Sequence, residues 1–96
     1  MKIIVVAHRN DKRPPEDFAP FLEPEAKKAL QLMAEDFARE IYSFANGKGA
    51  IMVVEAENEE QVRARLAELP FVQNDLLSLE IYPVGPYRGI VAAAKA

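Results

Sequence analysis

Residues 50–70, AIMVVEAENEEQVRARLAELP, contain a strand followed by a helix with both of its ends marked. Ala50–Glu55 is an apolar run rich in β-branched residues, which predicts a strand. Asn58, followed three residues later by Gln61, has the layout of a helix N-cap with its capping-box partner. Pro70 cannot continue a helix, so we expect this helix to end at about Leu69. Its apolar positions keep helical spacing: Val62, Leu66 and Leu69.

The stretch before residue 50 predicts a longer helix and another strand. Ile41–Ala45 leads into Asn46–Gly49, a segment with two glycines, so residues 41–55 are expected to form two strands around a turn. Pro24 suits the first turn of a helix. Apolar residues at steps of four, three and four mark the face of this helix that must be buried, and two more residues widen it. The first set is Ala26, Leu30, Met33 and Phe37, and the second is Ala29 and Leu32.

The two ends of the chain supply two more strands. Ile3–Ala7 is short and continuously apolar, which predicts a strand buried on both faces. Apolar and polar residues alternate along Leu77–Val84, which predicts the last strand. Pro83 favours an edge position for this strand. Arg9–Pro20 carries three prolines, so we expect a long loop that holds no helix. Residues 90–96 are expected to form a tail or an arm.

The predicted order, β-α-β-β-α-β, is typical of the ferredoxin-like α+β fold, a four-stranded antiparallel sheet with two helices on one face. A chain of 96 residues leaves no material for a second core, so residues 1–96 are expected to form a single domain. In the first and third strands, the residues that point to either face of the sheet are apolar. Both faces of the sheet must therefore be buried against other apolar groups. We therefore expect a homodimer that packs sheet on sheet, and the C-terminal residues offer a route to a higher homo-oligomer.

Composition excludes several classes of protein. Half of the residues are hydrophobic and 28% are charged, a balance that supports a packed core rather than a disordered chain. The sequence has no cysteine, which excludes disulfides and thiolate metal sites and makes the cytoplasm the expected location. A net charge of -3 argues against a nucleic-acid partner and against an anionic membrane. The apolar run near residue 5 is too short for a signal peptide or a membrane span.

Two segments, VVEAENEEQVRARLAELPF (residues 53–71) and LLSLEIYPVGPY (residues 76–87), resemble the C-terminal half of muconolactone isomerase-like proteins. These proteins belong to the dimeric α+β barrel superfamily, alongside YCII-related proteins, and Leu69-Pro70-Phe71 is the most telling match. The resemblance implies a pocket in which a proton moves within a small lactone, no metal or organic cofactor, and a homo-oligomer. YCII-related proteins tend to have a histidine near the start of the first helix. This chain has Phe21-Leu22-Glu23-Pro24 there, so no catalytic residue is carried over.

Two residues are candidates for the base of such a proton transfer. Asp36 is expected on the apolar arc of the first helix, beside Ala29 and Leu32, where a carboxylate can take a proton from carbon next to a carbonyl. The alternative for Asp36 is a structural hydrogen bond or ion pair. His8, the only histidine, ends the first strand, where it either reaches a pocket mouth or faces solvent. Glu25 shares the arc of Asp36, and its position in the first turn favours a role as a partner of the helix dipole over a role in proton transfer.

Four residues are candidates for substrate binding: Arg9, Tyr42, Phe71 and Tyr82. Aromatic rings commonly line apolar ligand pockets, although they are also ordinary core residues. The two tyrosines bring hydroxyls that can donate a hydrogen bond to a substrate carbonyl. Arg9, with Lys12 and Arg13, forms a small cationic cluster that can attract a carboxylate, although acidic neighbours cancel much of its charge.

Two functions from different classes fit these features. The first is a cofactor-independent enzyme, an isomerase or a related catalyst, that acts on a small lactone, enol or aromatic-derived acid. The alternative is a non-catalytic small-ligand-binding or assembly protein of the same fold. A second ionisable group converging on the candidate base is the feature that separates them.

Overall fold

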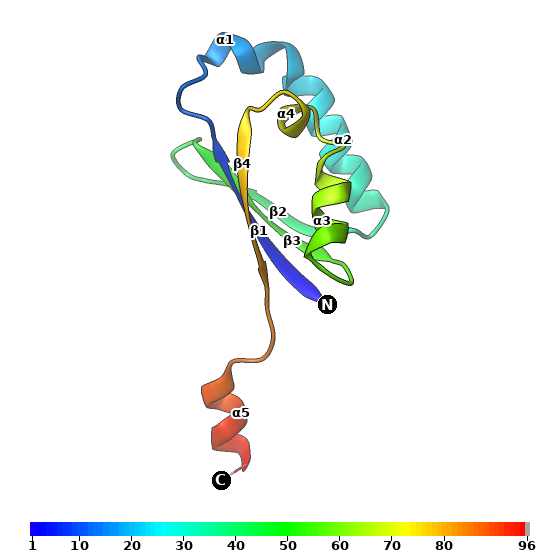
Figure 1. Cartoon of the computed structure of the whole chain (residues 1–96), viewed down its shortest axis with the longest axis vertical. Coiled ribbons are helices and arrows are strands. Elements are labelled where there is room, and N and C mark those ends of the chain that lie inside the picture. Colours follow the sequence, from blue (N-terminus) through cyan, green and yellow to red (C-terminus); the bar gives the residue numbers. More distant parts are fainter. Residues whose placement is uncertain (96) are drawn as a thin grey trace.

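The computed structural model describes residues 1–95 and contains one sheet with helices packed on one of its faces (Figure 1). The strands are β1 (Lys2–Arg9), β2 (Ala38–Ser43), β3 (Gly49–Glu55) and β4 (Leu77–Pro83). The helices are α1 (Pro15–Phe18), the 3-10 helix η1 (Ala19–Phe21), α2 (Leu22–Ala34), α3 (Glu59–Leu66), α4 (Pro70–Gln73) and α5 (Arg88–Lys95).

The sheet is antiparallel throughout, with strand order β2-β3-β1-β4. The most apolar strands, β1 and β3, take the two central positions, so Val5 lies opposite Met52 on one side and Ile81 on the other. The strand that contains Pro83 is an edge strand, as its proline predicted. This arrangement confirms the predicted ferredoxin-like α+β fold of the chain, while the homodimer stays a prediction.

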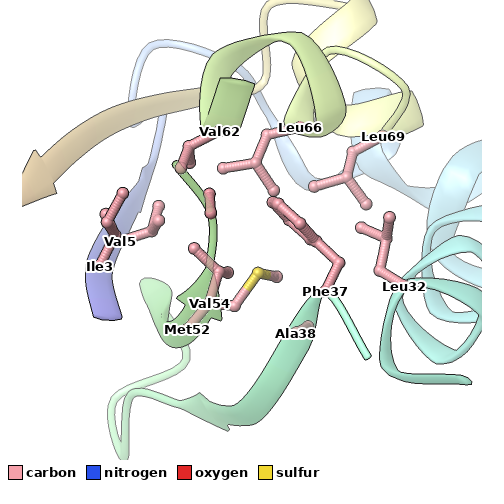
Figure 2. Close-up of a cluster of buried hydrophobic side chains, with 11 residues drawn as sticks. Ile3, Val5, Leu32, Phe37, Ala38, Met52, Val54, Val62, Leu66 and Leu69 are labelled. Atoms are coloured by element: carbon pink, nitrogen blue, oxygen red, sulfur yellow. The ribbon is translucent and has the colours of Figure 1, made fainter. Parts of the chain in front are cut away.

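The core lies between the sheet and the two longer helices of this face (Figure 2). Alternate residues of a strand point to the same side, so Ile3 and Val5 of β1 share the core with Met52 and Val54 of β3. Phe37, just before β2, extends towards Leu66 in Figure 2. The helices and the start of β2 complete the cluster with Leu32, Ala38, Ala56, Val62, Leu66 and Leu69.

The N-terminus of α3 forms as the sequence predicted. The Asn58 side chain accepts a hydrogen bond from the backbone N–H of Gln61 at 2.8 Å. The Gln61 side chain in turn accepts one from the backbone N–H of Glu57 at 2.7 Å. Two otherwise unpaired N–H groups are satisfied in this way, which fixes the start of the helix and places Val62 and Leu66 in the core.

One prediction about proline was wrong and another was incomplete. Arg9–Pro20 was expected to hold no helix, yet α1 begins at Pro15 and is followed by η1. Pro70 ends the predicted helix but also begins another one, α4. The physical reason is the same at both places, because proline is tolerated in the first helical turn, where its missing N–H has no partner in the helix.

The buried face of α2 differs from the predicted one. Leu32 is fully buried, whereas Leu30 is 68% exposed and Met33 is 40% exposed. The helix ends at Ala34, so Phe37 is buried from the segment before β2 rather than from the helix. The buried face is therefore shifted to the side of the predicted face that Ala29 and Leu32 widen, and this side also carries Glu25.

The opposite face of the sheet is not covered by any part of residues 1–95. Its centre is apolar and consists of Ile4, Val6, Ile51 and Val53. Tyr42 and Tyr82 flank this centre from the two edge strands. We call this surface the open sheet face.

The C-terminal segment leaves the domain. The backbone N–H of Val84 still donates to the carbonyl of Lys2 at 3.1 Å, and α5 then extends away from the sheet (Figure 1). The longest dimension of the molecule is therefore 56 Å, against 27 and 21 Å for the other two. The expected arm is thus helical over Arg88–Lys95, and Ala96 lies outside the described residues. Of the helices described, none has the length and apolar character needed to cross a bilayer.

Candidate functional site

A cavity of about 380 Å³ lies between α2 and the side of the sheet that faces the helices. Small side chains leave this space open, because Ala26 and Ala29 of α2 and Ala7 and Ala50 of the sheet all line it. Larger apolar side chains complete the wall: Val5, Leu22, Ile41, Met52, Leu66, Leu69, Leu77 and Leu79. A concave, mostly apolar space of this size is typical of sites for small molecules.

Two glycines shape the part of the cavity formed by the β2–β3 hairpin. Gly47 has a φ of 74°, which side chains disfavour, so its expected role in the turn is confirmed. Gly49 has a different role from the expected one. A Cβ atom there would lie 2.1 Å from the carbonyl oxygen of Ala7, so β3 can approach β1 at this point only without a side chain.

Glu25 carries the only carboxylate among the described residues that line this cavity. It lies in the first turn of α2 and is partly buried. One carboxylate oxygen, Oε1, accepts a hydrogen bond from the backbone N–H of Phe71 at 2.9 Å. Burial raises the pKa of Glu25, and the hydrogen bond from Phe71 opposes the shift only in part. A carboxyl group of this kind is a candidate for proton transfer.

Arg9, at the end of β1, brings a positive charge to the same cavity. Its guanidinium carbon lies 4.7 Å from the centre of the Phe18 ring and 5.8 Å from that of the Phe71 ring. The two rings meet edge to face with 5.3 Å between their centres. Cation–π contact therefore holds the guanidinium in place. Within residues 1–95 Arg9 forms no ion pair, so its charge is available to an anionic ligand.

The segment that follows β1 is fixed against the turn after α4. The backbone N–H of Asn10 donates to the carbonyl of Leu76 at 2.9 Å. The Arg13 side chain donates to Asp17 at 2.7 Å and to the carbonyl of Asn74 at 3.2 Å. These bonds carry Phe18 to its place beside Arg9, so the long segment helps to build the site.

His8 belongs to a different cluster, on the open sheet face. Its Nε2 lies 2.5 Å from Oε1 of Glu80, and the hydroxyl of Tyr82 donates to the other oxygen of Glu80 at 2.5 Å. The Tyr82 hydroxyl and His8 lower the pKa of Glu80, and the carboxylate raises the pKa of Tyr82. His8 and Arg9 also line a separate polar hollow of about 430 Å³. His8 therefore lies at this polar hollow and not in the lining of the apolar cavity.

Asp36 does not lie where the sequence predicted. The helix ends at Ala34, two residues earlier, and Asp36 is exposed in the following turn with a φ of 61°. Its backbone carbonyl accepts a hydrogen bond from the Arg39 side chain at 2.9 Å. The expected place on the buried face of the helix is therefore wrong, and Asp36 is absent from the cavity lining. Its catalytic role stays a prediction that this geometry does not favour.

The four predicted substrate-binding residues divide between the two faces of the sheet. Arg9 and Phe71 line the cavity. Tyr42 and Tyr82 lie on the open sheet face, which corrects the expectation that they line the cavity. Because side chains alternate along a strand, Ile41 points into the cavity and Tyr42 points away, where its hydroxyl donates to Glu40 at 2.7 Å.

The sequence placed Glu25 on the apolar arc of the helix, but the role at the helix dipole was favoured over a place in a cavity. The available signal was spacing, since Glu25, Ala29 and Leu32 follow one another at steps of four and three and share one helix face. The cluster around Glu80 was also missed, although Glu80 and Tyr82 are two residues apart on one strand. Within the described chain, no group of three metal-ligating side chains is placed to hold a metal ion.

The fold and the cavity together define a ferredoxin-like α+β protein with an apolar pocket beneath its helices. No protein-family model matches the chain, and a search of curated proteins finds no match. Among solved structures, the chain is similar to 5-chloro-2-hydroxyhydroquinone dehydrochlorinase from Burkholderia phenoliruptrix in complex with 2,5-dihydroxybenzoquinone. The TM-score is 0.71 at 13% sequence identity, over 93% of this chain and 98% of that chain. At this identity the likeness shows a shared fold, and membership of the muconolactone isomerase-like proteins stays a prediction.

Proposed function

We propose that this protein is a cofactor-independent enzyme that transfers a proton within a small lactone or aromatic-derived acid bound in the cavity. The observation that carries the proposal is Glu25, a carboxyl group of raised pKa in a cavity that is otherwise mostly apolar. Arg9 adds a cation to the same cavity. Further support comes from the dehydrochlorinase of similar fold, whose structure holds a small cyclic ligand.

In the proposed reaction, Arg9 binds the carboxylate or carbonyl oxygen of the ligand. The Glu25 carboxylate takes a proton from the carbon next to that carbonyl, and the electrons of the broken C–H bond move onto the oxygen as an enolate. The positive charge of Arg9 stabilises this enolate. The Glu25 carboxyl then returns the proton to another carbon of the conjugated system, so the product has the composition of the substrate.

The test uses Glu25→Gln, which keeps an oxygen to accept the hydrogen bond from Phe71 but cannot carry the proton. Wild-type protein is first screened by thermal shift against lactones, catechol-derived acids and small aromatic ketones, because a ligand of the folded state raises its melting temperature. Turnover of each stabilising ligand is then followed by ultraviolet absorption. We expect Glu25→Gln to lower kcat by about 100-fold or more with little change in ligand binding.

The matched control is Glu23→Gln, an exposed change two residues earlier on the same helix. Asp36→Asn and His8→Gln test the two bases that the sequence suggested, and we expect both to retain turnover. Full activity in Glu25→Gln would contradict the assignment of Glu25. A ligand that binds without chemical change would instead favour the non-catalytic binding protein.

We also propose that two copies of the chain pack through their open sheet faces. Ile51, 36% exposed, lies between Val6 and Tyr42 near the centre of this face. An Ile51→Asp substitution costs the single chain little but places a charge in the dimer contact. We expect it to lower the mass in light scattering, in multiples of the 10.7 kDa chain, below that of the unchanged protein. Ala45→Asp, an exposed change in the β2–β3 hairpin, is the control.

A further inference from the structure

Three apolar surfaces are exposed on the described chain. The first is the open sheet face. The second, the α2 stripe, consists of Ala26, Leu30 and Met33 on the outward side of α2, at steps of four and three. The third is the arm, residues 84–95, where Tyr87 is 73% exposed and Ile90 is 68% exposed. The open sheet face can pair with its own copy, which leaves the α2 stripe and the arm without a partner.

The arm has no partner in its own domain. Beyond Val84, no hydrogen bond or ion pair of residues 1–95 connects it to the rest of the chain, and Figure 1 shows α5 separated from the sheet and from the other helices. A helix of eight residues is marginal in water without a surface to pack on. Tyr87, Ile90, Val91 and Ala94 follow helical spacing, so the arm has one apolar side to bury.

We propose that the arm of one copy packs on the α2 stripe of a second copy. The two surfaces match in length, because residues 87–94 and residues 26–33 each span about 10 Å of helix. The arm and the rest of the described chain are also opposite in net charge. Arg88 and Lys95 are the only charged residues of the arm, which leaves ten basic and fifteen acidic residues, a net charge of -5, in residues 1–83.

The charges disfavour the simplest alternative. Two arms packed on each other would bring Arg88 and Lys95 of both copies together without a carboxylate. The α2 stripe instead carries Glu23 on its side, in an exposed ion pair with Lys27 at 2.9 Å. An exposed pair of this kind contributes little, so Glu23 is free to exchange its partner for Arg88 of the arm.

The contact is heterologous, because the surface that each copy gives differs from the surface that it receives. Two copies can therefore exchange arms reciprocally, or a larger number can form a closed ring. Ala26 belongs to the α2 stripe and also lines the cavity, so the arm of the second copy would lie at the rim of the proposed ligand site.

Cross-linking of single-cysteine variants tests the exchange, since the natural sequence has no cysteine. Ile90→Cys is made in one copy and Leu30→Cys in a second copy that carries a different tag, and the two are mixed, equilibrated and oxidised. We expect the mixed disulfide to exceed by several-fold the product formed with Ala67→Cys, an exposed position just after α3. Equal yields with the two partners would overturn the proposal.

The double variant with Leu30→Cys and Ile90→Cys in one chain tests whether the arm folds back on its own domain. A disulfide that forms mainly within one chain at high dilution would also overturn the proposal. Sedimentation velocity gives a second readout that needs no cross-link. We expect Leu30→Asp and Ile90→Asp each to raise the concentration at which copies associate, with unchanged circular dichroism, while Ala67→Asp leaves it unaltered. Ile51→Asp addresses the open sheet face separately, so the two interfaces are distinguishable.

Discussion

The side chain of Glu25 accepts a hydrogen bond from the backbone N–H of Phe71, 46 residues further along the chain, at 2.9 Å. This N–H lies in the first turn of α4 and has no partner within that helix. The carboxyl group therefore does two things, because it ties α2 to α4 and also faces the cavity between the helices and the sheet. A substitution at Glu25 must therefore keep the hydrogen bond between the two helices while it removes the carboxyl group from the cavity.

The raised pKa of Glu25 predicts a specific dependence of stability on pH. The folded state binds the proton more tightly than the unfolded state, so this residue's contribution is full below its unfolded pKa and is lost as pH rises through the folded value. Removal of the titration by Glu25→Gln is therefore expected to flatten a fall in stability just above the ordinary carboxyl range. The measurement is the free energy of unfolding in urea for both proteins between pH 4 and 7.

Other carboxyl groups act in the opposite direction, so only the difference between the two proteins is informative. Arg65 lowers the pKa of Glu35, and Lys28 lowers that of Glu68, and their contributions are lost as pH falls. Glu23→Gln serves as the control for loss of a negative charge near the start of α2. A wild-type curve parallel to that of Glu25→Gln would contradict the assigned pKa direction.

Arg9 is expected to set the preference of the cavity for anionic ligands. Loss of a charge-assisted hydrogen bond costs about 1.5–3 kcal/mol, so Arg9→Gln should weaken binding of a carboxylate ligand by about 10-fold to 150-fold. A neutral ligand of the same shape should lose far less. Calorimetric titration of both ligands checks this, with Lys12→Gln, an exposed cation three residues later, as control. Equal losses for the two ligands would assign Arg9 to structure rather than to recognition.

Stability measurements can check the inward face of α2. Leu32→Ala removes a fully buried side chain and is expected to cost about 2–5 kcal/mol. Leu30→Ala, two positions earlier on the outward side, should cost about 0.5 kcal/mol or less in dilute protein. Denaturant unfolding of both variants provides the comparison. A larger loss of stability in Leu30→Ala than in Leu32→Ala would indicate that the buried face of α2 is centred on Leu30.

Gly49 tests how tightly the hairpin approaches β1. Because a Cβ atom would meet the carbonyl oxygen of Ala7, Gly49→Ala is expected to destabilise the fold by about 1–3 kcal/mol. Gly85→Ala is the matched control, since a Cβ atom there has open space. Melting temperatures of the two variants measure the difference. Equal melting temperatures would show that the strands can separate at this point without cost.

The elements of the sheet and α3 could be predicted from the sequence because their signals are local. Alternation, β-branched runs and the cap at Asn58 depend on neighbours within a few residues. The short helices α1 and α4 were missed because Pro15 and Pro70 were taken only as helix breakers, although the first-turn position that was considered for Pro24 applies to them too.

The candidate site was harder to predict because a cavity forms where small side chains leave space unfilled. Ala26 and Ala29 contribute little to a hydrophobic pattern, so Leu30 and Met33 displaced the centre of the predicted buried face away from the cavity. The place of Glu25 in the cavity depends on Phe71 and on β1, which are distant in the sequence. Arg9 was identified from its charge, but its fixed position depends on Phe18 from the segment expected to be only a loop.

The size of the ligand that fits the cavity and the charges that it meets there are determined by different residues. Ala7, Ala26, Ala29 and Ala50 set how much volume is free, while Glu25 and Arg9 carry the charges. A change of alanine to valine or serine on the wall would narrow the space by one or two atoms without touching either charged group. Single substitutions on the wall can therefore change which ligands fit while the residues proposed for proton transfer stay the same.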